Sequence, residues 1–165
     1  MPTYQISPSY ESGQPLKWTE KVYQLFLPDY VKLTFILMLG FFILLRAFEM
    51  SVWLSSLGAI LWAFSSYFFI IIAAGHIWKF ITLAYIPPTI AGMVLAYRGK
   101  LLQGGLIFAL FVALQIMSNH VQMTYYFLFV MLFMAIAYLV QAYREGKVPQ
   151  FLKATGVLVI AGLIG

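Results

Sequence analysis

Long uncharged stretches alternate with short clusters of charged and polar residues along the chain, and this pattern predicts its helices. A helix needs about 20 mainly apolar residues to cross one bilayer. Four stretches reach that length without a charge, a fifth reaches it if its flanking residues extend it, and a last one is shorter. The pattern predicts spans at about 31–48, 51–74, 79–97, 101–118 and 121–143, with a truncated sixth at 154–165.

Residues 1–30 differ from the rest of the chain because they carry five charges and several prolines, and no apolar run of spanning length. We assign them to a loop segment outside the membrane. The predicted fold class is therefore all-α: a polytopic transmembrane helix bundle over residues 31–165, with five full spans plus a truncated sixth.

Composition supports this class and excludes others. Hydrophobic residues make up 63% of the 165 residues and charged residues 9%, against about a quarter charged in soluble domains. The formal charge is +5, but the ten Lys and Arg residues are scattered rather than gathered on a stripe, which argues against a nucleic-acid partner. The chain has no cysteine, which removes disulfides and thiolate chemistry.

The positive charges in the loops predict an orientation, because short cytoplasmic loops carry the excess of Lys and Arg. Alternate loops on one side hold most of them: Arg46, Arg98, Lys100, Arg144, Lys147 and Lys153. This side is predicted to be cytoplasmic. Residues 1–30 and the turns near residues 76 and 120 are then extracytoplasmic in a multi-pass protein.

This orientation requires export of the polar segment 1–30 with no signal sequence and no preceding span. The last apolar segment stops at Gly165 before it is long enough to cross. We therefore expect the chain to be an internal piece of a longer protein. Alone, it is expected to be inactive and poorly stable in detergent.

Polar residues close to membrane depth are the first candidates for function, because a central Lys or Asp costs about 2.5 to 3.5 kcal/mol to insert. His76 and Lys79 are three residues apart, so on a helix they share a face and could both meet one anionic group, such as a lipid phosphate. The alternative is that Lys79 extends to the outer headgroups and His76 only marks a turn.

A second polar group follows the fourth span on the same predicted side. Asn119, His120 and Gln122 offer donors and acceptors suited to a sugar hydroxyl or a phosphate oxygen. Alternatively, Asn119 caps a helix junction and His120 is solvated. The pair His76 and His120 lacks a settled carboxylate partner, so we predict no metal site.

Three further local features carry expectations. Pro87 and Pro88 lie inside the third span, where proline removes helix hydrogen bonds and predicts a kink or break. Such a helix either lines a watery cavity or is an inert kink. Arg46 and Glu49 are three residues apart and are predicted to pair. Several glycines, among them Gly92 and Gly104, allow helices to approach closely.

Four segments together resemble the bacterial YfhO-type polytopic membrane proteins: MPTYQISPSY, LWAFSSYFFIIIAAGHIWK, YIPPTIAGMVLAYRGK and ALQIMSNHVQMTYYF. The resemblance implies a GT-C-like membrane glycosyltransferase in the bacterial cytoplasmic (inner) membrane. Such an enzyme takes a sugar from a polyprenyl-phosphate-linked donor and glycosylates a cell-envelope acceptor on the outer side. Membrane lipid is a further partner.

The resemblance also bears on the catalytic base, because GT-C enzymes usually hold a catalytic carboxylate in the first external loop. Asp29, in LPDY just before a span, is the best-placed carboxylate of this chain, and the alternative is a residue upstream. No cofactor is predicted, and a divalent metal in the longer protein stays open. Two other readings are a transporter or lipid-carrier flippase that uses the broken third helix as a gate, and a non-catalytic membrane scaffold.

Overall fold

The computed structural model describes residues 29–118 and 121–165, and every regular element within them is a helix. The all-α class is therefore confirmed. The helices in chain order are α2 (Asp29–Ala47), α3 (Val52–Ala63), α4 (Ser66–Ala73), α5 (Ile77–Tyr97), α6 (Leu101–Met117), α7 (Val121–Arg144) and α8 (Val148–Ile164).

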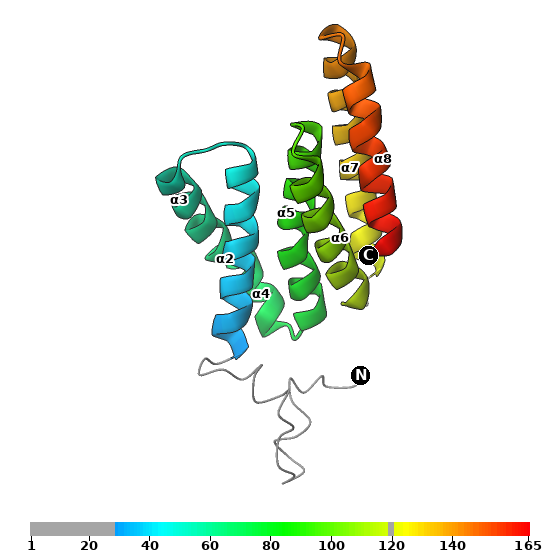
Figure 1. Cartoon of the computed structure of the whole chain (residues 1–165). Helices are drawn as coiled ribbons and strands as arrows, with labels where there is room; N and C mark the ends of the chain where they lie inside the picture. The colour runs from blue at the N-terminus through cyan, green and yellow to red at the C-terminus, as the bar shows by residue number, and fades with distance from the viewer. Residues whose placement is uncertain (1–28, 119–120) are drawn as a thin grey trace.

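Successive spans run up and down, so the turns gather at two opposite ends of the bundle (Figure 1). One end, here called the basic end, holds the turns 48–51, 98–100 and 145–147. The other, here called the histidine end, holds the start of α2, the α4–α5 turn at 74–76, the end of α6 and the start of α7. This up-and-down order follows from the short turns, which force neighbouring helices to be antiparallel.

Within residues 29–118 and 121–165, three helical stretches are long and apolar enough to cross a bilayer: Val52–Ala73, Ile77–Tyr97 and Gln122–Arg144. Two shorter apolar helices are Leu101–Met117 and Val148–Ile164. These features are those of a helical membrane protein. Helix α8 begins at Val148, earlier than the apolar run at 154, because Pro149 favours the first turn of a helix and Lys153 is accommodated on an exposed face.

The turns at the basic end and the α4–α5 turn share one backbone geometry. After α5, Gly99 adopts a φ of +91°, and its N–H donates back to the Ala96 carbonyl at 3.0 Å. Glycine favours this left-handed conformation because it has no Cβ. Glu49 takes the same conformation after α2, with a φ of 64°, although it is not glycine. The remaining left-handed glycines are Gly75 and Gly146.

The second predicted span is divided, which the apolar pattern does not show. Helix α3 ends before Phe64, and Ser65 is extended, with φ −61° and ψ 135°, before α4 begins. Serine competes with helix geometry through its own hydroxyl, so a serine pair favours a helix start. Packing holds the division in place, because Trp62 stacks on Phe41 at 4.7 Å between ring centroids and meets the edge of Phe68 at 5.2 Å.

The third predicted span is not broken, and this corrects the sequence-based expectation that left open a break at the prolines. Helix α5 runs without interruption from Ile77 to Tyr97 with Pro87 and Pro88 inside it. Both prolines are buried in the bundle. A Cβ at Gly40 of α2 would lie 2.6 Å from the Ala84 carbonyl, the acceptor that Pro88 cannot use, and 3.0 Å from the Pro88 Cδ. Tight packing from α2 thus covers the weakened site.

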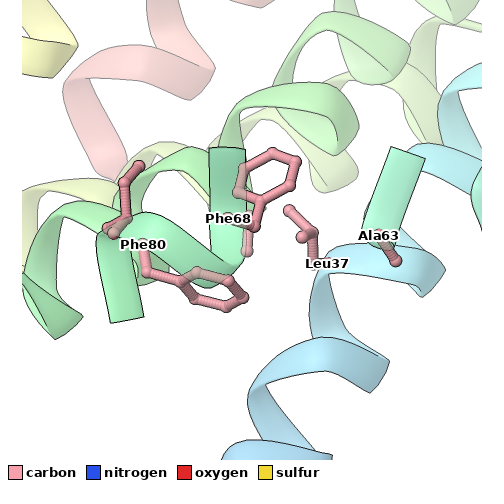
Figure 2. Packing of buried hydrophobic residues seen from close by; sticks show 6 residues of the cluster. Leu37, Ala63, Phe68 and Phe80 are labelled. Carbon is pink, nitrogen blue, oxygen red and sulfur yellow. The ribbon is translucent and has the colours of Figure 1, made fainter. Parts of the chain in front are cut away.

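One core lies between α2, α3, α4 and α5 near the histidine end. Phe80, at 1% exposure, meets the ring of Phe68 edge-on at 5.7 Å. Leu37 and Ala63 complete the contact from α2 and α3 (Figure 2). A second core joins α5, α6 and α8 and consists of Met93, Ala96, Phe108, Ala154, Leu158 and Ala161.

Helices α5 and α6 approach each other through small residues. A Cβ at Gly104 would lie 2.5 Å from the Ala96 nitrogen and 2.6 Å from the Gly92 carbonyl oxygen. Both atoms belong to the backbone, so no side-chain rotation could make room for it. The close approach expected from the glycines is therefore real, and Gly92 and Gly104 face each other.

Candidate functional site

The predicted residues His76 and Lys79 lie at the histidine end, at the start of α5. His76 is the residue before the helix, is exposed, and its side chain makes no capping hydrogen bond. Lys79 lies in the first turn and is half-buried. The first turn of α5 is tied to the preceding loop by a hydrogen bond from the Phe80 N–H to the His76 carbonyl at 3.1 Å. The imidazole therefore remains available to a ligand.

The second predicted group is described only in part. Gln122 is exposed in the first turn of α7, and its Nε2 donates to the Tyr126 hydroxyl at 3.3 Å. Asn119 and His120 lie outside the described residues. The predicted base, Asp29, is the first residue of α2 at this same end (Figure 1). These roles remain predictions.

A buried polar link beneath this end was not predicted from the sequence. The hydroxyls of Thr82 and Ser118 are 2.6 Å apart, with exposures of 0% and 3%. Each hydroxyl has one hydrogen, so one of the two donates across the link and the other donates within its own helix end, either Ser118 to the Gln115 carbonyl at 2.6 Å or Thr82 to the Trp78 carbonyl at 2.9 Å. The link joins α5 to the end of α6, so it fixes these two helix ends relative to each other. The sequence signal was a hydroxyl residue within α5 and another directly after α6.

The structure also has a pocket at the opposite, basic end, and sequence reasoning missed it. Its volume is about 300 Å³. Its lining residues come from the ends of α5 and α7 and the start of α8, which is the depth of lipid headgroups for helices that span a bilayer. Its lining residues are Tyr97, Arg98, Tyr138, Gln141, Ala142, Glu145, Lys147, Gln150 and Phe151.

Three stacked aromatic rings form one wall of this pocket. Tyr97 lies between Tyr138, at a centroid distance of 4.7 Å, and Phe151, at 5.0 Å and nearly parallel. The Tyr97 hydroxyl lies 3.2 Å from the Thr155 Oγ1. Stacked rings that each come from a different helix hold α5, α7 and α8 together. The wall of the pocket is therefore formed by packed and oriented side chains.

An ion pair to Arg98 corrects the pairing expected from the sequence. The Arg98 guanidinium lies 3.0 Å from the Glu49 carboxylate, whereas Arg46 donates to the Met50 carbonyl. The left-handed backbone of Glu49 turns that residue back towards the α5–α6 turn. The spacing of three residues favoured Arg46 as the partner of Glu49. The chain reverses after α2, however, and Glu49 contacts Arg98 in the turn between α5 and α6. The side chain of Arg98 is 33% exposed.

Glu145 and Lys147 form a second charged pair on the rim of the pocket. Lys147 Nζ donates to one carboxylate oxygen of Glu145 at 2.8 Å, and Gln141 Nε2 donates to the other at 2.8 Å. These hydrogen bonds, from Lys147 first and Gln141 second, lower the pKa of the exposed Glu145 carboxyl. The contact is therefore complete at neutral pH and is lost as the pH falls through that lowered pKa.

The described residues contain no group of three His, Cys, Asp or Glu side chains that could hold a metal ion. His76 accordingly has no carboxylate partners of that kind in the part of the chain that the structure describes. Comparison with protein-family models, curated proteins and solved structures finds no match to this chain. The functional argument therefore depends on the residues themselves.

Proposed function

We propose that the chain is part of a GT-C-like membrane glycosyltransferase that uses a polyprenyl-phosphate-linked sugar to glycosylate a cell-envelope polymer. The observation that carries the proposal is the gathering of polar groups at the histidine end. There His76, Lys79 and Gln122 lie at one end of an apolar bundle, together with Asp29 at the start of α2 (Figure 1). The resemblance to YfhO-type proteins supplies the reaction class.

The chemistry of such a transfer matches the residue types at this end. A hydroxyl acceptor needs a general base, for which Asp29 or an upstream carboxylate is proposed. The departing polyprenyl phosphate needs cations or donors that stabilise its negative charge. Lys79, His76 and His120 are proposed for that role, with Asn119 and Gln122 as further substrate contacts. The buried link from Thr82 to Ser118 supports the proposal because it holds α5 and the end of α6 together at this end of the bundle.

Replacing Lys79 or His120 by alanine in the full-length protein should lower sugar transfer without changing membrane insertion. Loss of one donor to the leaving phosphate is expected to cost about 100-fold in turnover. The assay measures transfer of a radiolabelled sugar from its polyprenyl-phosphate donor in isolated membranes. Lys153→Ala is the matched control, because it removes the same charge from an exposed position in α8. Full activity in both variants would remove these residues from the site.

The flippase alternative is less well supported than the transferase. It relied on a third helix broken at Pro87 and Pro88, and α5 is continuous through both prolines. The division of a span lies instead at Phe64 and Ser65, between α3 and α4. Substrate movement across the membrane without covalent transfer would favour the flippase, and neither activity in the full-length protein would favour a membrane scaffold.

A further inference from the structure

We propose that the pocket at the basic end binds the phosphate of an anionic phospholipid headgroup. This pocket has no place in the transferase proposal, since it lies at the end of the bundle opposite His76 and Lys79 (Figure 1). The inference therefore stands or fails independently of that function. It rests on the position, charge and donor groups of the pocket.

Position is the first argument. The pocket residues come from the last turns of α5 and α7, the first turn of α8, and the turns between these spans. Helices α5 and α7 are long and apolar enough to cross a bilayer. Their ends therefore lie where headgroups begin, and basic pockets between spanning helices at that level are suited to lipid phosphate.

Charge is the second argument. The basic end carries six cations, Arg46, Arg98, Lys100, Arg144, Lys147 and Lys153, and two carboxylates, Glu49 and Glu145. Two of the cations, Arg98 and Lys147, line the pocket itself with only Glu145 among the carboxylates. The basic end therefore has an excess of positive charge that attracts an anion, and each pocket cation also contacts one carboxylate, Arg98 that of Glu49 and Lys147 that of Glu145.

The donor groups are the third argument. Glu49 Oε1 contacts one terminal nitrogen of Arg98, and a guanidinium has five N–H donors in a planar fork that suits phosphate. Gln150 adds an amide beside Gly99: a Cβ at Gly99 would lie 3.1 Å from its Nε2. The first turn of α8 also lies at the pocket, and the start of a helix favours an anion. The stacked rings of Tyr97, Tyr138 and Phe151 keep these donors in place.

The experiment titrates the purified full-length protein with phosphatidylglycerol and measures the bound lipid by native mass spectrometry. Arg98→Gln should weaken binding by about tenfold or more, because a charged hydrogen-bond donor to phosphate is lost. Lys153→Gln removes the same charge at the same end, but outside the pocket, and should weaken binding much less. Equal losses in both variants would show only a general charge effect and would overturn the proposal.

A second variant guards against misfolding of Arg98→Gln. Glu145→Gln changes an exposed side chain and releases Lys147 from its carboxylate partner. The proposal predicts that phosphatidylglycerol binds more tightly to this variant, with a dissociation constant lowered by up to about fivefold. A change of this size corresponds to the loss of one exposed ion pair that competes with the phosphate. If Glu145 served only to hold the turn, its replacement would not increase the affinity for phosphatidylglycerol. Unchanged or weaker binding in a folded Glu145→Gln variant would overturn the proposal.

A third arm distinguishes the sources of the phosphate. Glycerol 3-phosphate presents the phosphate without acyl chains. The proposal predicts that it binds far more weakly than phosphatidylglycerol, because it lacks acyl chains that could contact the exposed apolar side chains of the helices. Equal binding of glycerol 3-phosphate and phosphatidylglycerol would overturn the assignment to a lipid and indicate a soluble phosphate compound.

Discussion

Replacing Gly104 by alanine should destabilise the bundle by about 3 kcal/mol, since overpacking a close helix contact costs that much at its upper range. The new methyl group would lie 2.5 Å from the Ala96 nitrogen and 2.6 Å from the Gly92 carbonyl oxygen. Both are backbone atoms of α5, so the helices must separate to admit it. Separation would also loosen the second core, in which Phe108 of α6 packs against α8. The free energy of unfolding is measured by SDS titration in mixed micelles.

Gly156 provides a matched control for this substitution. It also lies inside a helix, α8, but a Cβ built there meets no atom within 4 Å. Gly156→Ala should leave stability unchanged or raise it by up to about 1 kcal/mol, because alanine is the better helix former. If the two alanine variants unfold alike, then the contact between α5 and α6 is not as close as described.

Replacing Phe80 by alanine should cost about 3 kcal/mol or more, as large-to-small changes of buried aromatic residues do. The ring is 1% exposed and packs against Phe68 within the core that also holds Leu37 (Figure 2). This cluster joins both halves of the divided second span to α2 and α5. The variant should therefore also release α4, and faster proteolysis near residues 64–76 would report that release.

Phe133→Ala is the corresponding control, because Phe133 lies on α7 with 67% exposure. Its ring faces outward, where lipid can replace the contacts that truncation removes. We expect its free energy of unfolding to stay within about 0.5 kcal/mol of the parent value. A loss from Phe133→Ala as large as that from Phe80→Ala would mean that α7 packs more deeply than the structure shows.

The apolar pattern was enough to predict the helical class and to place several helices. Helices α6 and α7 agree closely with the stretches predicted at 101–118 and 121–143, because Lys100, His120 and Arg144 mark where the apolar sequence stops. The division at Ser65 was missed because its neighbours are as apolar as the rest of the span. It depends on rings from α2 and α4 that meet Trp62.

The prolines show another limit of local rules. A break was one of the outcomes expected at Pro87 and Pro88, yet α5 is continuous, with Gly40 packed against the Ala84 carbonyl that Pro88 cannot use. That compensation comes from a residue far away in the sequence. Tertiary packing thus decides what a local rule only suggests.

The pocket at the basic end could not be predicted for the same reason. Its rings belong to residues 97, 138 and 151, which no local motif connects. The ion pair between Arg98 and Glu49 also joins two turns that are distant in sequence, whereas helix spacing favoured Arg46. At the histidine end, the order of the loops was enough to predict that His76, Lys79 and Gln122 lie at one end of the bundle. The contacts of these residues could not be predicted in this way.

The central claim is that the two ends of the bundle face opposite sides of a membrane, and cysteine labelling tests it most directly. The chain has no cysteine of its own, so single substitutions can be read without a background. Ala74→Cys and Gln122→Cys mark the histidine end, and Ser51→Cys marks the basic end, all at exposed positions. In intact bacterial cells, an impermeant maleimide should label residues 74 and 122 but should reach residue 51 only after the membrane is opened. Labelling of all three residues from the same side would contradict the account.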